Sequence, residues 1–127
     1  MSDDNLLKSY KSENGSLVID IEELPEIVTV KFVGQSVEMQ PGQFLSPIFE
    51  KHVLNNDKDI VMDFVHLRSL TSPTLGPVIQ VLNRASEGSR KVKVIYNSDF
   101  DWQETTFTAF KVYEKSDQVV IASQPST

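Results

Sequence analysis

The sequence contains no cysteine, which excludes disulfide bonds, thiolate zinc sites and cysteine nucleophiles. It also contains neither G-x-x-x-x-G-K-[ST] nor H-E-x-x-H, so it predicts neither a phosphate-binding loop nor a zincin-type metal site. Its apolar runs are only a few residues long, and its acidic start, MSDDN, differs from a secretory leader. We therefore expect a cytoplasmic protein that needs no metal or cofactor and does not insert into a membrane.

The chain also lacks an excess of basic residues, because its formal net charge is -6. A negative domain does not attract a phosphate backbone, so nucleic-acid binding is not expected. With 127 residues, 39% hydrophobic and 24% charged, the composition is typical of one globular domain.

Hydrophobic periodicity predicts alternating strands and helices. Short β-branched or apolar runs predict strands at 17–21, 27–33, 58–64, 91–96 and 118–122. Helical spacing predicts helices within 44–56, 75–85 and 98–111. The pattern indicates an α/β domain with a mixed sheet of about four to five strands covering residues 17–122. Residues 1–16 are expected to form a flexible polar arm, and residues 123–127 a polar tail.

A polar break at Ser72 separates the apolar strand from the following amphipathic helix. In α/β sheets, functional groups collect in such loops beyond the carboxyl ends of strands. Serine is also a common helix cap, and Pro73 suits the first helical position. Pro77 complicates that start, so a second possibility places the cap at Gly76 and leaves Ser72 in an exposed loop.

Asp63, His66 and Ser72 lie close in sequence, which raises the possibility of a serine hydrolase. The stretch lacks the G-x-S-x-G elbow, however, and closeness in sequence does not place a base beside the serine. We expect His66 to be a loop residue and the protein not to be an enzyme.

The stretch "IVMDFVHLRSLTSPTLGPVIQVL" resembles the signature of the STAS domain, the family of bacterial anti-sigma factor antagonists. In that family a strand ending in Asp-Leu is followed, after a fixed interval, by Asp-Ser-x-Gly-Leu-Gly at the start of a helix. Asp63 and Phe64 match the strand end, Ser72 matches the phosphorylatable serine, and Leu75 and Gly76 match the closing Leu-Gly. By order of elements the resemblance extends over roughly residues 17–121.

The resemblance implies regulation by partner switching. The unphosphorylated protein would bind an anti-sigma factor that is also a serine kinase of the histidine-kinase-like ATPase type, and phosphorylation of Ser72 would release it. A serine phosphatase is a further expected partner. The implied partner-binding residues are Asp63, Thr71, Ser72, Thr74, Leu75 and Gly76.

Two positions depart from the family pattern, since Thr71 stands where the family often has Asp and Thr74 where it often has Gly. These departures motivate a second hypothesis, a constitutive STAS subunit of a larger assembly such as a stress-sensing complex or a lipid-transport ABC system.

Overall fold

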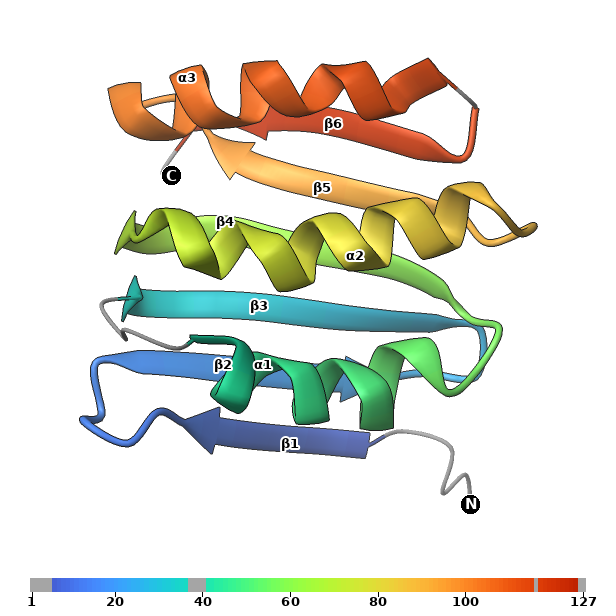
Figure 1. Cartoon of the computed structure of the whole chain (residues 1–127), viewed down its shortest axis with the longest axis horizontal. Coiled ribbons are helices and arrows are strands. Elements are labelled where there is room, and N and C mark those ends of the chain that lie inside the picture. The colour runs from blue at the N-terminus through green and yellow to red at the C-terminus, as the bar shows by residue number, and fades with distance from the viewer. Residues whose placement is uncertain (1–5, 37–40, 116, 126–127) are drawn as a thin grey trace.

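Figure 1 shows the computed structural model of the chain, which describes residues 6–36, 41–115 and 117–125. The sheet strands are β1 Leu6–Lys11, β2 Leu17–Glu23, β3 Ile27–Ser36, β4 Asp59–Leu70, β5 Val92–Asn97 and β6 Val119–Gln124. The helices are α1 Pro41–Phe49, α2 Leu75–Ser86 and α3 Asp101–Ala109. A π-helical turn, Glu50–Leu54, follows α1, a 3-10 turn, Ser72–Thr74, precedes α2, and a 3-10 segment, Phe110–Lys115, follows α3.

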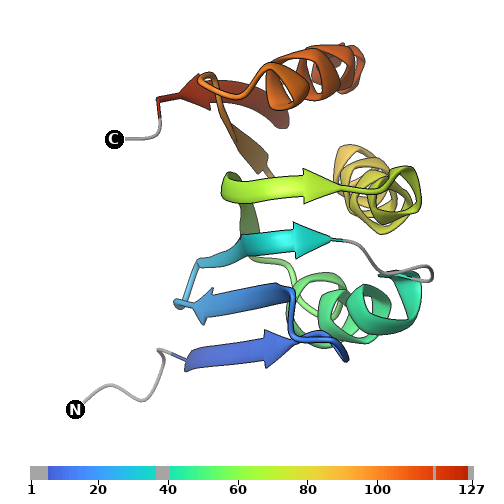
Figure 2. The same ribbon diagram turned by 90° about the vertical axis from the view of Figure 1, so that its left-hand side faces the viewer.

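The strands form one mixed sheet in which each strand lies beside the next in the chain. β1, β2 and β3 are antiparallel neighbours, whereas β3, β4, β5 and β6 run parallel. Right-handed crossovers between successive parallel strands put their helices on the same side, and Figure 2 shows all three helices on one face. The expected α/β fold with a mixed sheet is confirmed, with six strands in place of four to five.

A chain of aromatic rings fills the space between the sheet and the helices. Phe64 of β4 stacks on Phe32 of β3 with ring centroids 4.4 Å apart and contacts Phe107 of α3 at 4.7 Å. Phe49 of α1 and Tyr96 of β5 extend the chain to either side. Val78 and Leu82 of α2 belong to the same buried cluster, so all three helix-bearing crossovers pack on one continuous core.

The sixth strand, β1, corrects the prediction of a flexible arm over residues 1–16. Residues 6–11 pair with β2 along their whole length, from Leu6 opposite Glu23 to Lys11 opposite Val18. The polar composition of this segment does not predict a strand, because a strand at the edge of a sheet needs few apolar residues. Its lysines discourage pairing of this edge with a strand of another molecule. Residues 1–5 lie outside the described residues. At the other end, β6 extends to Gln124, into the predicted tail.

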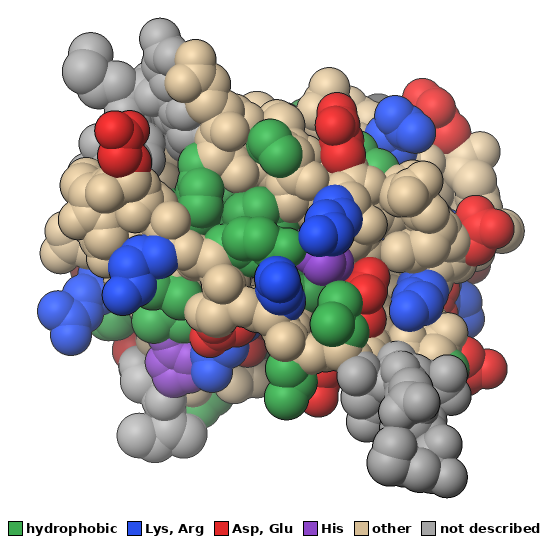
Figure 3. All heavy atoms as spheres, turned by 90° about the horizontal axis from the view of Figure 1, so that it is seen from below, with side chains coloured by type: hydrophobic (Ala, Val, Ile, Leu, Met, Phe, Trp, Pro, Cys, Tyr) green, Lys and Arg blue, Asp and Glu red, His purple; other side chains and the backbone are tan. Residues whose placement is uncertain are grey.

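Side chains attach β1 to the helical layer as well as to the sheet. The Tyr10 hydroxyl lies 2.6 Å from Nε2 of His52. The His52 side chain is only 2% exposed, and its Nδ1 lies 3.6 Å from a carboxylate oxygen of Glu23. Figure 3 looks onto this edge and shows hydrophobic side chains gathered at its centre among basic ones. Tyr10 thus joins the N-terminal strand to the turn after α1.

β4 is longer than predicted because side-chain amides replace a missing strand. Its pairing with β5 ends at Asp63, but its pairing with β3 continues to Leu70. The Gln103 side chain donates hydrogen bonds of 2.8 Å to the carbonyls of Phe64 and Leu67, and Asn97 donates one of 3.0 Å to Val65. These amides satisfy buried carbonyls that β5 does not reach.

The extension of β4 also corrects the prediction for His66. This residue is an exposed member of the strand, paired in register with Val33, and not part of a loop. A register shift between Asp63 and His66 bends the strand, and Asp63 accepts a hydrogen bond of 2.9 Å from the amide of Val65 there.

In the described part of the chain, no helix is long and apolar enough to cross a membrane.

Replacement of Gln103 by Leu tests the role of these amides. We expect Gln103→Leu to lower the free energy of unfolding by about 3 kcal/mol, because two buried carbonyls lose their donors. Urea denaturation followed by circular dichroism measures this change. Gln80→Leu, at an exposed position of α2, serves as the matched control and should stay within about 0.5 kcal/mol of the native protein. Equal effects of the two substitutions would contradict this account.

Candidate functional site

Ser72 is the first residue of the helical turn that leads into α2, and its side chain is exposed. Thr71, which is extended with φ -86° and ψ 154°, precedes the turn in the cap position. Neither predicted helix start is therefore correct, since Ser72 and Gly76 both lie inside the helical run. The Ser72 hydroxyl forms no hydrogen bond with another described residue. A structural role as a helix cap does not account for this serine.

Three buried or half-buried hydroxyl groups hold the Ser72 turn against β3. Thr74 is fully buried, and its hydroxyl lies 2.6 Å from that of Ser36 and 3.1 Å from that of Thr71. The backbone amide of Thr71 also donates to the carbonyl of Ser36 at 3.1 Å. The turn is thereby fixed at the carboxyl ends of the neighbouring parallel strands β3 and β4.

This hydroxyl cluster explains both departures from the STAS pattern, because Thr71 and Thr74 contact each other. Thr74, a predicted partner-binding residue, has no exposed surface and supports the turn from within. Thr71 is half-buried and lies at the edge of the exposed turn. Ser36 was not identified from the sequence. It lies 38 residues from Thr74, so no local pattern connected them.

Two more predicted residues lie beside Ser72 on the same exposed turn. Leu75 is half-buried, while Gly76 is exposed, and a side chain added at Gly76 would extend into open space. Ser72 and Gly76 are four residues apart in a helical run, so they lie on the same face. The turn therefore exposes the Ser72 hydroxyl next to Gly76, where the helix surface carries no side chain.

Asp63, by contrast, does not lie in this cluster. It is opposite Lys31 and Ile95 within the sheet, and its neighbours Met62 and Phe64 are buried under the helices. Alternation along the strand places Asp63 on the opposite face. It is also roughly 20 Å from the end of β4, given seven residues of extended chain. The structure thus separates Asp63 from the other predicted partner-binding residues.

Within residues 6–36, 41–115 and 117–125, no histidine or carboxylate is hydrogen-bonded to Ser72 as a base for a serine nucleophile. His66 lies on β4, and no hydrogen bond joins it to Ser72 or to Asp63 among the described residues. A nucleophilic serine needs a base within hydrogen-bonding reach. In the same part of the chain, no group of three or more acidic or histidine side chains is placed to hold a metal ion.

A hollow of about 440 Å³ opens beside Ser72, between the end of β4, the start of α2 and α3. Its lining consists of Ser69, Leu70, Ser72, Leu75, Trp102 and Thr106. None of these side chains is ionisable. Trp102 and Thr106 were not identified from the sequence as site residues, because α3 follows Ser72 only after another strand.

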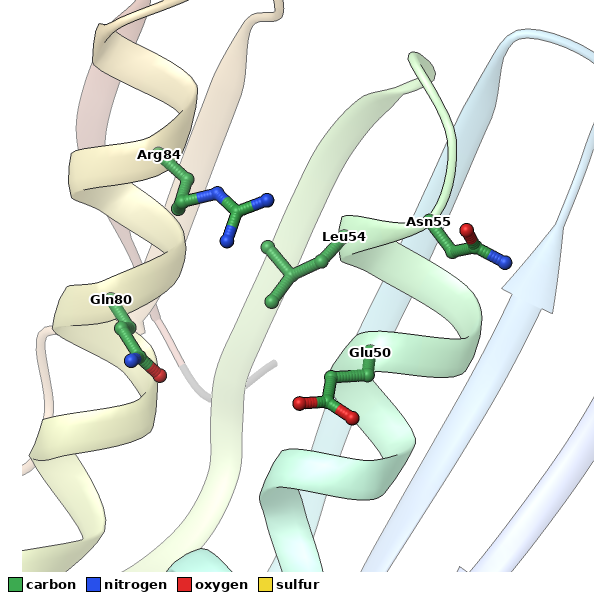
Figure 4. Close-up of a pocket in the computed structure, with 5 residues that line it drawn as sticks. All are labelled: Glu50, Leu54, Asn55, Gln80 and Arg84. Atoms are coloured by element: carbon green, nitrogen blue, oxygen red, sulfur yellow. The ribbon is translucent and has the colours of Figure 1, made fainter.

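A second hollow, of about 260 Å³, lies between the turn after α1 and α2, and its walls are charged (Figure 4). Arg84 extends from α2 toward Leu54, Gln80 lies one turn earlier on α2, and Glu50 extends from the facing helical segment toward α2. No ion pair joins Glu50 and Arg84 within the described ranges. This hollow lies away from Ser72.

A third hollow, at the amino ends of β3 and β4, is acidic. It has a volume of about 580 Å³ and includes Glu26, Asp57 and Asp59. Nearby Arg90 donates a hydrogen bond of 2.6 Å to the carbonyl of Lys58. Burial lowers the pKa of Arg90, while Asp57 and Asp59 act to raise it. This edge is the one opposite to Ser72, so the three hollows differ both in place and in charge.

Replacement of Thr74 by Val tests the hydroxyl cluster while keeping the side-chain shape. We expect Thr74→Val to lower the free energy of unfolding by about 1–2 kcal/mol, because the hydroxyl groups of Ser36 and Thr71 lose their partner. It should also speed amide hydrogen exchange in residues 71–75. Thr105→Val, at an exposed position of α3, is the control. Unchanged stability and exchange in Thr74→Val would show that the cluster does not hold the turn.

Comparison with known proteins yields a similarity of fold. No protein-family model and no curated protein matches the chain. Among solved structures, the chain is similar to an uncharacterized protein from the DUF3478 family with a SpoIIAA-like fold, from Shewanella loihica PV-4. The two are 14% identical, with a TM-score of 0.48, over 95% of this chain and 89% of that one.

Proposed function

We propose that this protein is a non-enzymatic regulatory module that switches partners through phosphorylation of Ser72. The observation that carries the proposal is an exposed serine hydroxyl to which no described residue forms a hydrogen bond, on a turn that buried side chains hold in place. A hydroxyl that is exposed and makes no hydrogen bond within the described ranges is available for modification. A fixed turn presents it to a kinase in one geometry.

The position of Ser72 allows a phosphate without refolding. A phosphate adds about -1.5 to -2 charges at neutral pH, which the positive end of a helix dipole favours. Pro73 has no amide hydrogen, and the amide of Thr74 already donates to Thr71 at 3.0 Å. The dipole, more than free amide groups, therefore supports the phosphorylated form.

The proposed partner surface comprises the exposed turn and the outward side of α2. Thr71, Ser72, Leu75 and Gly76 form its centre, and Gln80 and Arg84 continue it along the helix. Thr74 acts from beneath as a positioning residue. Asp63 is left out because it lies on β4, far from the turn.

The proposed partner is an anti-sigma factor and serine kinase of the histidine-kinase-like ATPase type, with a serine phosphatase that restores the hydroxyl. The unphosphorylated module binds the kinase and frees its target. Phosphate at Ser72 reverses this, because a charge buried at an interface without a counter-charge weakens binding.

The phosphorylation site can be tested with the cognate kinase and ATP. We expect mass spectrometry to find phosphate on Ser72 of the native protein and none on Ser72→Ala. Ser72→Ala should retain the kinase, whereas Ser72→Asp should bind it at least about tenfold more weakly. Ser89→Asp, an exposed serine beyond the far end of α2, is the matched control and should bind normally. Absence of phosphate at Ser72, with equal binding by all variants, would refute the proposal.

The partner surface can be tested by adding a side chain at Gly76. We expect Gly76→Gln to keep or raise stability, since glycine disfavours helices by about 1 kcal/mol and the added side chain meets no neighbour. It should weaken kinase binding about tenfold or more, because the side chain separates the two surfaces. Calorimetry measures the binding. Gly88→Gln, at the other end of α2, also has open space and should bind like the native protein.

A second candidate function is a constitutive STAS subunit of a larger assembly. The exposed apolar side chains of Leu7 and Val120, on the two edge strands, favour it, since they are 75% and 45% exposed. Purification from the native cell distinguishes the two functions. A stable assembly that phosphorylation does not change would favour the constitutive subunit.

A further inference from the structure

One face of the sheet is not covered by a helix. All three helices lie on the opposite face, as Figure 2 shows for the described part of the chain. Directly paired residues of neighbouring strands place their side chains on the same face. The strand register therefore identifies the side chains of the uncovered face, and it arranges them in two rows that cross all six strands.

The first row, which we call the Leu7 row, joins residues that are all exposed or half-buried. In order from β1 to β6 it consists of Leu7, Glu22, Thr29, Val61, Lys93 and Val120. Apolar side chains stand at both ends of this row, where Leu7 is 75% and Val120 is 45% exposed. Such side chains gain free energy when another surface covers them.

The second row, which we call the Ser9 row, lies two residues away along each strand. In order from β1 to β6 it consists of Ser9, Asp20, Lys31, Asp63, Ile95 and Ala122. The residues between the two rows, such as Val30, Met62 and Val94, are fully buried under the helices. Since side chains alternate along a strand, both rows face away from the helices.

The charges on this face alternate in sign from one strand to the next. β2 carries Asp20 and Glu22, β3 carries Lys31, β4 carries Asp63 and β5 carries Lys93. Within the described ranges, no ion pair joins any two of these side chains. A surface of one sign, such as a nucleic acid or an anionic membrane, would be repelled by half of them. The face therefore suits a partner surface that carries the same alternation in the reverse order.

We infer that a second copy of this chain covers the uncovered face, related by a two-fold axis that runs parallel to the strands between β3 and β4. A two-fold dimer uses the same surface on both subunits, so that surface must complement itself. This axis keeps each row opposite itself but reverses the strand order. β3 then faces β4 of the second copy, β2 faces β5, and β1 faces β6. Sheets packed face to face in this aligned manner lie about 10 Å apart.

The Leu7 row complements itself under this axis. Leu7 faces Val120 of the second copy, so the most exposed apolar side chains of the two edge strands cover each other. Glu22 faces Lys93 of the second copy, which supplies each with an opposite charge. Glutamate and lysine are long enough to meet across the space between two packed sheets.

The Ser9 row complements itself at the axis. Lys31 faces Asp63 of the second copy, and the symmetry repeats this pair on the other side of the axis. Asp20 would face Ile95 of the second copy, but its carboxylate already accepts a hydrogen bond of 2.7 Å from Ser9. The charge pairs near the axis define the position of the two copies more than they add affinity.

Other two-fold axes would bring like charges together. An axis through β3 would place Lys31 on its own copy and Asp20 on Asp63, and an axis through β4 would place Asp63 on its own copy. An axis perpendicular to the strands would put β2 on β2, so that its carboxylates, those of Asp20 and Glu22, face one another. Like charges in contact oppose association. Of these arrangements, only the axis between β3 and β4 pairs opposite charges.

The uncovered face is large enough for a weak dimer. Six strands spaced about 4.8 Å apart and about six residues long present roughly 500 Å² per copy, or about 1,000 Å² in total. This is near the lower limit of specific protein interfaces. The Ser72 turn and the outward side of α2 are not on this face, so the dimer leaves the proposed partner surface accessible. The dimer therefore does not rest on the proposed function.

Charge reversal at Glu22 and Lys93 tests the dimer. We expect sedimentation velocity to show the native protein as a dimer at about 100 μM. Lys93→Glu and Glu22→Lys should each be at least about tenfold weaker in dimerisation, because like charges then face each other twice. An equal mixture of the two variants should form a heterodimer as tightly as the native dimer, because both charge pairs are again opposite. β3 and β4 separate Glu22 from Lys93 within one chain, so this recovery must act between copies.

The matched control is Lys111→Glu, which makes the same change of charge at an exposed position on the helical side and should dimerise like the native protein. The recovery in the mixture also shows that neither variant is misfolded. A monomeric native protein, including one that binds a different protein through this face, would overturn the proposal. So would unchanged dimerisation in both single variants, or a mixture that stays monomeric. Phosphorylation of Ser72 in the Lys93→Glu monomer reports on the proposed function separately.

Discussion

The structure depends on the hydrogen bonds that the Gln103 and Asn97 side chains donate to carbonyl groups of β4. β5 leaves β4 at Asp63, so the following half of β4 has a strand neighbour on one side only. A buried strand with unpaired carbonyls would be unstable, and the two amides remove that cost. β4 can then continue along β3 to Leu70. That continuation carries the Ser72 turn to the carboxyl edge of the sheet.

At that edge a second set of polar contacts, between hydroxyl groups, holds the turn that carries Ser72 in one position. Thr74 joins Ser36 of β3 to Thr71 of the turn, which accounts for two side chains that differ from the STAS pattern. A threonine in place of glycine restricts the backbone and adds a hydroxyl at the same time. The exposed Ser72 then stands on a support that does not include it. In the proposed switch, a change at its hydroxyl alters binding without altering the fold.

Much of the fold was predictable because its elements have strong local periodicity. The strands of the parallel half, the order of helices and the break at Ser72 all follow from apolar spacing. β1 was missed because six half-polar residues at a sheet edge give no such signal. The extra length of β4 and the strand position of His66 were missed for another reason. They depend on Gln103 and Asn97, which lie more than 30 residues further along the chain.

The sequence by itself determined an acidic α/β domain without cysteine, a serine at the break between a central strand and an amphipathic helix, and a resemblance to STAS domains around it. The tertiary structure alone decided which predicted residues share a surface. It brought Ser72 and Leu75 together with Trp102 and Thr106 around one hollow. It also buried Thr74 against Ser36 and placed Asp63 on the opposite face of the sheet. Periodicity is a property of neighbouring residues, whereas these contacts form between segments that only the folded sheet brings together.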